Sequence, residues 1–391
     1  MKQILYIEVC NFQDYPLGGH LSFALHLTAA MKGDIDIAGI RTDNELKEGC
    51  WDKCEIAGYN YNFFNIGNFS KSFKKPIIPT RITDFLCIKR HIKQILKHKE
   101  YDIIIVQTPE TLFCLPKAYR RRTCLIMPGV GNPLSISRYK WARAFASVYD
   151  KVFFRYAKEA THILAAADQQ AITEFVVRGK GTILPERVFQ FPTRYDADIF
   201  HLTEKSDARR TLGIPSGATV FVTTGRLNWF KGWKFMIDAF AIFKKQTPDA
   251  VLYFLGKGED ELKINEYIKQ LNLQESVILA GVHPLPTVAQ YLNAADLFIM
   301  GSYREGWSTS LVEAIACGKA CVVTEFSSAH DLVKDGENGF VQVERNEDDF
   351  AALMSQALKL PCQQIEKHTQ AAYGFSVQTM RQQLNKILQF E

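Results

Sequence analysis

Residues 219–233 read TVFVTTGRLNWFKGW and combine a strand pattern, a glycine loop and the start of a helix. The run Thr219–Thr223 is short and rich in β-branched residues, which is typical of a buried strand. Gly225 follows the run, and a helical spacing of apolar residues begins at Trp233. A strand that leads through a glycine loop into a helix is typical of doubly wound α/β domains, which bind ligands beyond the carboxyl ends of their strands.

Short apolar runs alternate with helical patterns along the rest of the chain. The other predicted strands are Ile4–Val9, Ile35–Ile40, Asp102–Val106, Thr123–Met127, His162–Ala166, Val188–Phe191, Ala250–Leu255, Val277–Leu279, Leu297–Met300, Cys321–Val323 and Phe340–Val343. The predicted helices include Leu21–Met31, Ile88–Leu96, Trp233–Lys245 and Leu311–Cys317. This alternation predicts parallel sheets that are covered by helices on both faces.

The chain is long enough for two domains. Its 391 residues exceed what one hydrophobic core comfortably holds. The polar stretch 191–219 contains Pro192 and Pro215 and ends where a new strand–helix series starts. We therefore predict an α/β protein with two Rossmann-like, doubly wound domains that face a central cleft, where ligands should bind.

Composition excludes several classes of protein. The chain is 47% apolar and 23% charged, which is ordinary for a globular protein and argues against disordered and fibrous classes. No apolar run approaches the roughly 20 residues of a membrane span. The apolar start carries Glu8, so it predicts a first strand rather than a signal peptide. The nine cysteines lack zinc-site spacing, and we expect reduced thiols in a cytoplasmic protein.

Basic residues are concentrated in the first half, with 19 basic against 5 acidic residues between Lys71 and Lys158. Two helical segments there each carry an apolar stripe and a basic face. The first segment has the apolar stripe Ile88, Ile92, Ile95 and Leu96 and the basic residues Lys89, Lys93, Lys97 and Lys99. The second has the apolar stripe Trp141, Phe145, Val148, Val152 and Tyr156 and the basic residues Lys151, Arg155 and Lys158. This pattern fits a basic surface over a packed core, or peripheral docking on anionic lipid at the inner face of a membrane. Nucleic acid is not expected, since no recognition motif accompanies the charge.

The first motif is the loop Gly225–Gly232. Arg226 and Lys231 stand five residues apart on a loop that leads into a helix N-terminus. Two cations beside a glycine and a helix start suit a diphosphate. The alternative is an Arg and a Lys that are merely solvated on a turn.

The second motif follows the predicted strand Leu297–Met300. Glu305 falls in the loop, Ser308 is a plausible N-cap, and Glu313 lies about one turn inside the next helix. Carboxylates accept paired hydroxyl hydrogen bonds, which suits the vicinal diols of ribose or a hexose. The alternative is a capping arrangement followed by an ordinary helix glutamate.

Together the two motifs resemble the signature of glycosyltransferase family 4, the retaining group 1 enzymes of the GT-B fold. The resemblance covers nearly all of the chain, is densest over 219–345, and includes the turn Asp335–Phe340. It implies that Arg226 and Lys231 hold the donor diphosphate, that Glu313 holds the ribose hydroxyls, and that Glu305 contacts the donor hexose. The implied catalytic residues are Arg226, Lys231 and Glu305. The implied donor-binding residues also include Gly225, Gly306, Trp307, Ser308, Thr309, Ser310, Leu311 and Glu313.

A glycine pair follows the first predicted strand. Gly18, Gly19 and His20 precede the helix Leu21–Met31, and glycines there let the backbone approach a phosphate or an acceptor. The pair resembles the family's first glycine loop, although a tight turn would read the same way. The pair lacks the G-x-G-x-x-G spacing that is typical of nicotinamide-dinucleotide sites.

One segment departs from the family pattern. Pro128 stands where the family commonly has a histidine near the donor sugar. Gly129 and Asn132, with His20, are the remaining candidates on the sugar side. The departure leaves the donor sugar and the activity open.

No cofactor and no metal are expected. Asp196 and Asp198 invite comparison with a metal-binding D-x-D, but their place between the domains favours a structural role. Arg226 and Lys231 would neutralise the donor charge instead. The GT-B resemblance implies that the terminal helix, Phe375–Leu388, crosses back to the first domain. The predicted domains are 1–195 with 372–391 on the acceptor side, and 196–371 on the donor side.

The expected function is hexosyl transfer from a UDP- or GDP-sugar to a glycan or lipid-linked acceptor, in cell-envelope polysaccharide or glycolipid synthesis. Two alternatives stay open. One is a nucleotide-sugar epimerase or phosphorylase of the same fold. The other is a donor-binding subunit with impaired catalysis, which Pro128 suggests.

Overall fold

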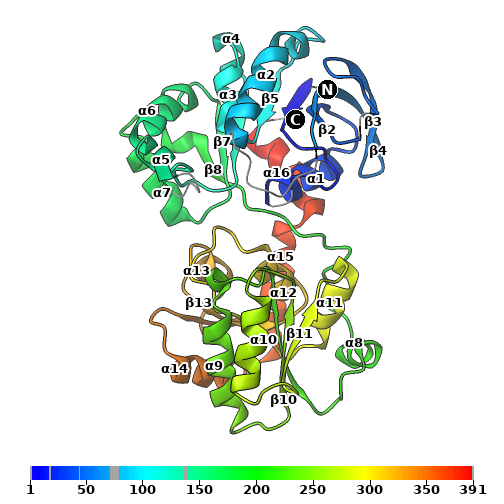
Figure 1. The fold of residues 1–391 in the computed structure, drawn as a ribbon, viewed down its shortest axis with the longest axis vertical. Coiled ribbons are helices and arrows are strands. Elements are labelled where there is room, and N and C mark those ends of the chain that lie inside the picture. Colours follow the sequence, from blue (N-terminus) through cyan, green and yellow to red (C-terminus); the bar gives the residue numbers. More distant parts are fainter. Residues whose placement is uncertain (1, 17–18, 44, 71–78, 136–139, 390–391) are drawn as a thin grey trace. The chain divides into compact units, whose positions relative to one another are not determined.

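A computed structural model describes residues 2–16, 19–43, 45–70, 79–135 and 140–389. The chain forms two compact units. The first comprises Met1–Arg194 and Met380–Glu391, and the second comprises Tyr195–Thr379. Each unit is built around its own parallel sheet, as the alternating pattern predicts (Figure 1).

The first unit contains an eight-stranded sheet in the order β3-β4-β2-β1-β5-β6-β7-β8. Its strands are β1 (Ile4–Ile7), β2 (Asp36–Arg41), β3 (Trp51–Ile56), β4 (Tyr59–Asn68), β5 (Ile103–Val106), β6 (Thr123–Met127), β7 (His162–Ala165) and β8 (Val188–Gln190). All neighbours pair in parallel except β3 and β4. Every residue of β1, β5 and β6 is buried, because a central parallel strand is covered on both faces.

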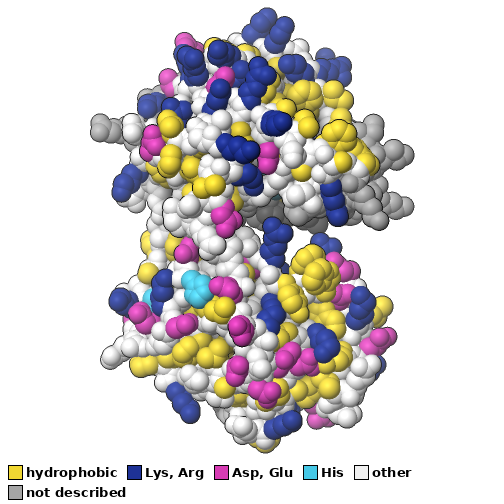
Figure 2. Space-filling model, turned by 90° about the vertical axis from the view of Figure 1, so that its left-hand side faces the viewer, with side chains coloured by type: hydrophobic (Ala, Val, Ile, Leu, Met, Phe, Trp, Pro, Cys, Tyr) yellow, Lys and Arg dark blue, Asp and Glu magenta, His cyan; other side chains and the backbone are white. Residues whose placement is uncertain are grey.

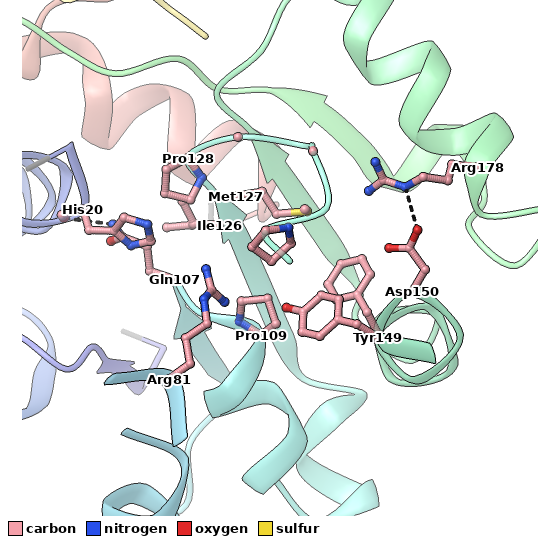
Figure 3. A pocket seen from close by; sticks show the side chains of 14 residues that line it. His20, Arg81, Gln107, Pro109, Ile126, Met127, Pro128, Tyr149, Asp150 and Arg178 are labelled. Carbon is pink, nitrogen blue, oxygen red and sulfur yellow. Dashed lines mark hydrogen bonds and ion pairs between the residues drawn. The ribbon is translucent and has the colours of Figure 1, made fainter. Parts of the chain in front are cut away.

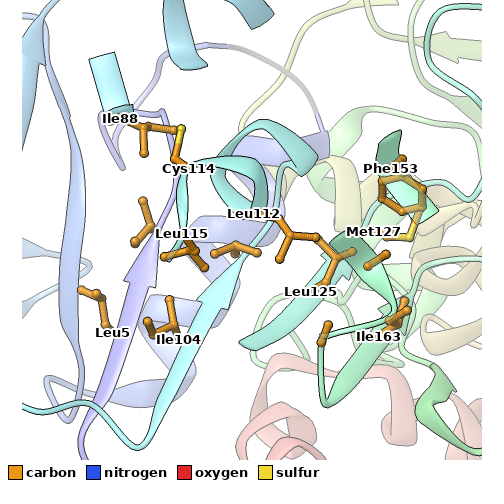
Figure 4. Close-up of a cluster of buried hydrophobic side chains, with 14 of the residues drawn as sticks. Leu5, Ile88, Ile104, Leu112, Cys114, Leu115, Leu125, Met127, Phe153 and Ile163 are labelled. Carbon is orange, nitrogen blue, oxygen red and sulfur yellow. The ribbon is translucent and has the colours of Figure 1, made fainter. Parts of the chain in front are cut away.

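The helices of this unit pack on the sheet and close its core. They are α1 (Gly19–Met31), α2 (Thr80–Leu96), α3 (Pro109–Cys114), α4 (Lys117–Arg120), α5 (Lys140–Arg143), α6 (Ala146–Ala157), α7 (Gln169–Arg178) and most of α16 (Val377–Ile387), with a 3₁₀ turn at Pro185–Arg187. Figure 4 shows strand residues such as Leu5 and Ile104 in one buried cluster with Ile88 of α2 and Leu112 of α3. Asp168 caps α7 by accepting a hydrogen bond from the Ala171 amide at 2.6 Å.

The hairpin β3–β4 was not predicted from the sequence. Its turn residues, Ala57 and Gly58, have φ angles of 51° and 78°, as a two-residue hairpin turn requires. Asparagines are disfavoured in strands and are frequent in β4, which hides the strand pattern. Asn65 is fully buried there because its side-chain amide donates to the Leu46 carbonyl at 2.7 Å.

The second unit contains a six-stranded, fully parallel sheet in the order β11-β10-β9-β12-β13-β14. Its strands are β9 (Thr219–Thr224), β10 (Ala250–Leu255), β11 (Val277–Gly281), β12 (Leu297–Met300), β13 (Ala320–Thr324) and β14 (Gly339–Gln342). Its helices are α8 (Lys205–Leu212), α9 (Trp233–Lys244), α10 (Glu261–Gln270), α11 (Leu285–Ala294), α12 (Thr309–Ala316), α13 (Ala329–Leu332), α14 (Glu347–Ala357) and α15 (Cys362–Ala372), with 3₁₀ turns at Trp229–Lys231 and Tyr373–Phe375. The predicted fold class, two parallel-sheet α/β domains, is confirmed.

The boundaries between the units differ slightly from the predicted ones. The chain returns to the first unit at Met380 rather than at residue 372. Residues just before this point stay with the second unit because Phe375 packs on Trp307, with ring centroids 5.1 Å apart, and Ser376 forms a β-bridge with Tyr195. The other boundary falls between Arg194 and Tyr195.

Candidate functional site

The first motif lies at the carboxyl ends of β9, β10 and β12. Gly225 and Lys231 line a hollow there together with Thr224 from β9, Leu255 from β10 and Ser302 after β12. Gly225 has a φ of 137°, and a Cβ at this position would lie 3.6 Å from the Cε of Lys231. The lysine side chain therefore runs along the backbone of the glycine, whose own amide donates to the Leu255 carbonyl at 2.9 Å.

Two glycines allow the loops of this hollow to pack closely. Gly232 has a φ of 66°, and an added Cβ would lie 1.8 Å from the carbonyl oxygen of Gly301. Gly256 is equally tight, because its Cβ would lie 1.9 Å from the Gly225 carbonyl oxygen. Only glycine fits at such positions.

Lys231 and Glu305 belong to different motifs, and the structure brings them together. The Lys231 Nζ lies 2.6 Å from the Glu305 Oε1, and the Ser302 hydroxyl donates to the same oxygen at 2.6 Å. The two charged side chains are 29% and 14% exposed, respectively. A mostly buried, doubly bonded carboxylate holds the ammonium group in place without removing it from solvent.

Arg226 has a different environment. Its Nε donates to the Glu259 carboxylate at 2.9 Å, and the two side chains are 69% and 54% exposed. Surface pairs of this kind contribute little stability. The guanidinium can therefore change partners at small cost when an anion is bound.

The helix α12 presents the second motif. Ser308 is its N-cap, and the Ser308 hydroxyl accepts a hydrogen bond from the Leu311 amide at 3.3 Å. Trp307 and Leu311 are buried, so their side chains belong to the core and could offer a ligand only backbone groups. Around the start of the helix, Gly306 is exposed, and Thr309 and Ser310 are partly exposed.

Glu313 lies one turn inside α12 and is half-buried. Among the residues that the structure describes, its carboxylate has neither a hydrogen bond nor an ion pair. Desolvation raises its pKa to about 7. A carboxylate without a protein partner is poised to accept hydroxyl groups from a ligand.

Arg345 also supports the site, and the sequence analysis missed it. Its guanidinium donates to the carbonyls of Gly301, at 3.0 Å, and Ser302, and lies 3.7 Å from the ring centroid of Tyr303. Tyr303 joins an exposed aromatic group with Trp229 and Phe230, which stack at 3.8 Å. A lone arginine after a strand gives no local signal of this role.

The candidates in the first half lie at a pocket of the first unit. Gly19 begins α1, His20 and Gly129 line the pocket, and Gly18 lies outside the described residues. Asn132 is engaged in its own loop, where its side chain donates to the Ala146 carbonyl and accepts from the Leu134 amide, both at 2.8 Å. Pro128 lines the same pocket as His20 (Figure 3).

The Asp-Ala-Asp segment forms part of the chain that leads into the second unit. The Asp196 carboxylate accepts hydrogen bonds from the Asp198 amide at 3.0 Å and the Gln378 side chain at 2.9 Å. Within the described ranges, no cluster of three or more His, Cys, Asp or Glu side chains could hold a metal ion. All nine cysteines are free thiols.

Comparison with known proteins identifies the second unit. Residues 204–374 match the family model of group 1 glycosyl transferases. The chain therefore carries a group 1 glycosyltransferase domain, and its two parallel-sheet units have the GT-B fold, as the resemblance implies.

Particular relatives agree with this class. A UDP-Gal:alpha-D-GlcNAc-diphosphoundecaprenol alpha-1,3-galactosyltransferase of Escherichia coli is 26% identical over 275 residues, which are 66% of each protein. A poly(glycerol-phosphate) alpha-glucosyltransferase of Bacillus subtilis is 33% identical over 142 residues, 36% of this chain and 21% of the relative. An uncharacterized glycosyltransferase of Methanocaldococcus jannaschii is 25% identical over 271 residues, 66% of this chain and 63% of the relative. The chain thus spans less than two thirds of the length of each.

Solved structures share the fold over the whole chain. Sucrose-phosphate synthase from Thermosynechococcus elongatus superposes with a TM-score of 0.75 at 16% identity, covering 100% of this chain and 98% of that one. HepE of Anabaena, in complex with UDP and glucose, gives a TM-score of 0.70 at 18% identity, covering 100% of both chains.

Proposed function

We propose that the protein is a retaining glycosyltransferase of family 4. It moves a hexosyl group from a UDP- or GDP-sugar to a hydroxyl of a glycan or lipid-linked acceptor, in cell-envelope polysaccharide or glycolipid synthesis. The observation that carries the proposal is the 2.6 Å pair between Lys231 and Glu305, which joins two motifs that are 74 residues apart in the sequence.

The donor diphosphate would lie over Gly225, between Lys231 and Arg226. Negative charge builds up on this leaving group as the glycosidic bond breaks, and fixed cations stabilise it more in the transition state than in the ground state. The start of α12, around Gly306–Ser310, adds partial positive charge, while the Ser308 amide itself donates to the Ser328 hydroxyl at 3.2 Å. Glu313 would accept the ribose hydroxyls, and Glu305 would contact the hexose.

Retention would follow from attack on the same face as the leaving group. The donor phosphate itself accepts the proton of the acceptor hydroxyl, so no enzymic nucleophile is required. Neutralisation of the diphosphate falls to side chains rather than to a metal ion. The name of the Escherichia coli relative gives UDP-galactose as its donor and a diphosphoundecaprenol-linked sugar as its acceptor, which supports this pair of substrate classes.

The surface of α6 supports peripheral contact with anionic lipid. The apolar stripe that could have been a core face is exposed: Trp141, Phe145 and Val148 are 57%, 54% and 55% exposed, and Val152 is 40% exposed. The helix packs instead through Phe153, Phe154 and Ala157. Lys151 and Arg155 are exposed beside Val148 and Val152 at helical spacing. Figure 2 shows basic and apolar side chains side by side on this unit.

A row of apolar side chains flanked by bases matches the interface of an anionic bilayer. No helix in the described part of the chain is long and apolar enough to cross a membrane. Replacing Phe145, Val148 and Val152 by serine should abolish co-sedimentation with phosphatidylglycerol vesicles. Equal sedimentation of this variant and the native chain, or equal binding to neutral vesicles, would contradict the membrane contact.

A thermal-shift screen with UDP-, GDP- and ADP-sugars tests the donor assignment. A bound donor raises the unfolding temperature because it stabilises only the folded state. One nucleotide class should give a clear shift, and product analysis should then show transfer that depends on an acceptor. Conversion of the donor sugar without acceptor would favour an epimerase, and binding without transfer or donor hydrolysis would favour a donor-binding subunit. No shift with any nucleotide would overturn the proposal.

A further inference from the structure

Arg345 lies just after β14 and reaches the loop that follows β12. Its Nη2 donates to the carbonyl oxygens of Gly301, at 3.0 Å, and Ser302, and to the Thr324 hydroxyl at 3.2 Å. The Thr324 hydroxyl in turn donates to the Ser302 carbonyl at 2.7 Å. One side chain therefore satisfies the carbonyls of the first two residues of the loop, and a hydroxyl from the neighbouring strand β13 reinforces this contact.

The same guanidinium packs against aromatic rings. Its Cζ lies 3.7 Å from the ring centroid of Tyr303 and 5.1 Å from that of Phe235. The Tyr303 amide donates to the Phe230 carbonyl at 2.7 Å, which ties the loop after β12 to the loop after β9. A planar cation can stack on a ring and form hydrogen bonds at its edge at the same time, whereas the ammonium group of a lysine cannot.

The loop that Arg345 holds carries the acid that contacts the donor lysine. The Ser302 hydroxyl donates to the Glu305 Oε1 at 2.6 Å, and the Lys231 Nζ lies 2.6 Å from the same oxygen. Arg345 bonds to the carbonyl of this serine. A displacement of Ser302 would therefore move the Glu305 carboxylate, and the ammonium group with it.

A second connection runs through the backbone. The Gly301 carbonyl oxygen lies so close to Gly232 that a Cβ on Gly232 would be 1.8 Å from it. Gly232 directly follows Lys231 in the sequence. Arg345 bonds to this same Gly301 carbonyl at 3.0 Å. Both connections end at Lys231, so the position of the guanidinium bears on the position of the ammonium group by two paths.

Another arginine holds the opposite end of β12 with similar contacts. Arg209 is buried, and its guanidinium donates to the carbonyls of Ala294, at 3.0 Å, and Ser216, at 2.6 Å. It also pairs with Asp296 at 2.7 Å. Ala294 and Asp296 precede β12, whereas the hollow beside Lys231 lies at the carboxyl end of this strand. Arg209 is therefore a matched comparison for an arginine that only stabilises the unit.

We propose that Arg345 is a positioning residue for the transfer reaction. It fixes the loop Gly301–Glu305 so that the Glu305 carboxylate holds the Lys231 ammonium group where the leaving diphosphate gains negative charge. Arg345 acts through these two side chains and does not itself contact the donor. The proposal rests on the proposed function, because it takes the hollow beside Lys231 to be the donor site.

Steady-state kinetics of conservative variants test the proposal. Arg345→Met should lower kcat about 10- to 100-fold, because the misplaced cation no longer matches the transition state. The donor KM should change much less, since the cation stabilises the transition state more than the bound donor. Arg345→Lys keeps a charged donor but loses the planar contact with Tyr303, so its kcat should lie between those of Arg345→Met and the native chain. Arg209→Lys should keep a kcat close to the native value.

A double-mutant cycle separates positioning from general destabilisation. In a Lys231→Ala background, Arg345→Met should lower kcat by less than about twofold further, because the group that Arg345 positions is absent. Thr324→Val removes one hydroxyl of the same network and repeats the cycle with a smaller change if Arg345→Met does not fold. A full multiplicative loss in the double variant, native kcat in Arg345→Met, or an equal loss in Arg209→Lys would overturn the proposal.

The chemical reactivity of Lys231 gives a readout that does not depend on activity. Reductive methylation followed by mass spectrometry measures the rate at which each lysine amine reacts, with Lys234 as the internal reference. Lys231 should react several-fold faster in Arg345→Met than in the native chain, and at the native rate in Arg209→Lys. Unchanged reactivity in Arg345→Met would overturn the proposal. If the native chain neither bound a nucleotide nor transferred a sugar, the proposed function would fail, whereas this measurement would still decide whether Arg345 positions the ammonium group.

Discussion

The candidate donor site of the second unit and the pocket of the first unit both lie where parallel strands end, yet their charged groups differ. In the second unit, Lys231 and Arg226 stand at or near the surface, each with one carboxylate partner. In the first unit, Arg81 and Arg178 are also paired, and desolvation raises the pKa of two further acids, buried Glu8 and half-buried Asp84. A parallel sheet supplies the location, and the side chains on its loops decide what is bound. The accessible cations of the second unit suit a diphosphate.

The largest expected effect concerns the cations of the second unit. Lys231→Ala should lower turnover by about 10²–10³-fold, as for the loss of one group that stabilises developing negative charge. Initial rates of nucleotide release, at saturating donor and acceptor, measure this effect. Lys234→Ala is the matched control, because Lys234 is exposed on α9, which directly follows the loop, and pairs with Asp238 at 2.7 Å. Similar turnover of Lys231→Ala and Lys234→Ala would contradict the assignment of Lys231 to the donor diphosphate.

A second prediction concerns the backbone that holds the donor loop. Gly232→Ala should destabilise the protein by about 2–4 kcal/mol, because the new Cβ would meet the Gly301 carbonyl and the residue has a positive φ. Urea unfolding measures the change. Gly217→Ala, where no atom lies within 4 Å of the added Cβ, should change stability by about 0.5 kcal/mol or less. Equal urea midpoints for Gly232→Ala and Gly217→Ala would show that the stability of the protein does not depend on the close approach of the two loops.

The third prediction uses the pH dependence of Glu313. Its pKa is raised from 4.5 to about 7, so the folded state favours the protonated form. The resulting stabilisation is present below pH 4.5 and is lost as the pH rises through 7. Glu313→Gln should therefore be more stable than the native chain at pH 8, by up to about 3 kcal/mol, and equally stable at pH 4. Thermal unfolding at several pH values measures the difference, and a constant difference would contradict it.

The same residue should make donor binding depend on pH. Because the ionised carboxylate is the better hydroxyl acceptor, UDP affinity should fall as the pH drops below about 7 in the native chain. The dependence should be weaker in Glu313→Gln. Calorimetric titrations at pH 6 and pH 8 compare the two proteins. An identical pH dependence in both would assign the effect to another group.

Much of the second unit could be predicted from the sequence because its features are local. The strand Thr219–Thr224, the glycine loop and the helix from Trp233 are contiguous. Ser308 caps α12 as its position predicts. The contact between Lys231 and Glu305 follows once both loops are placed at the carboxyl ends of neighbouring strands, β9 and β12.

The first unit was less predictable because its features depend on tertiary contacts. Strand β4 of the hairpin is rich in asparagines. It pairs with β2, and this contact forms only in the folded chain. The exposed stripe on α6 has the spacing of a core face, and only the packing of Phe153 and Phe154 shows which side is buried. The environment of His20 joins Glu8, Arg81 and Gln107 from distant segments, which no local pattern connects.

The most direct test of the account is a crystal structure with UDP bound. The account predicts the diphosphate over Gly225, within hydrogen-bond distance of Lys231 and Arg226, and the ribose hydroxyls on the Glu313 carboxylate. Arg226 should have exchanged Glu259 for a phosphate oxygen. A nucleotide bound elsewhere, with Arg226 still paired to Glu259 and Glu313 facing only solvent, would contradict the central claim.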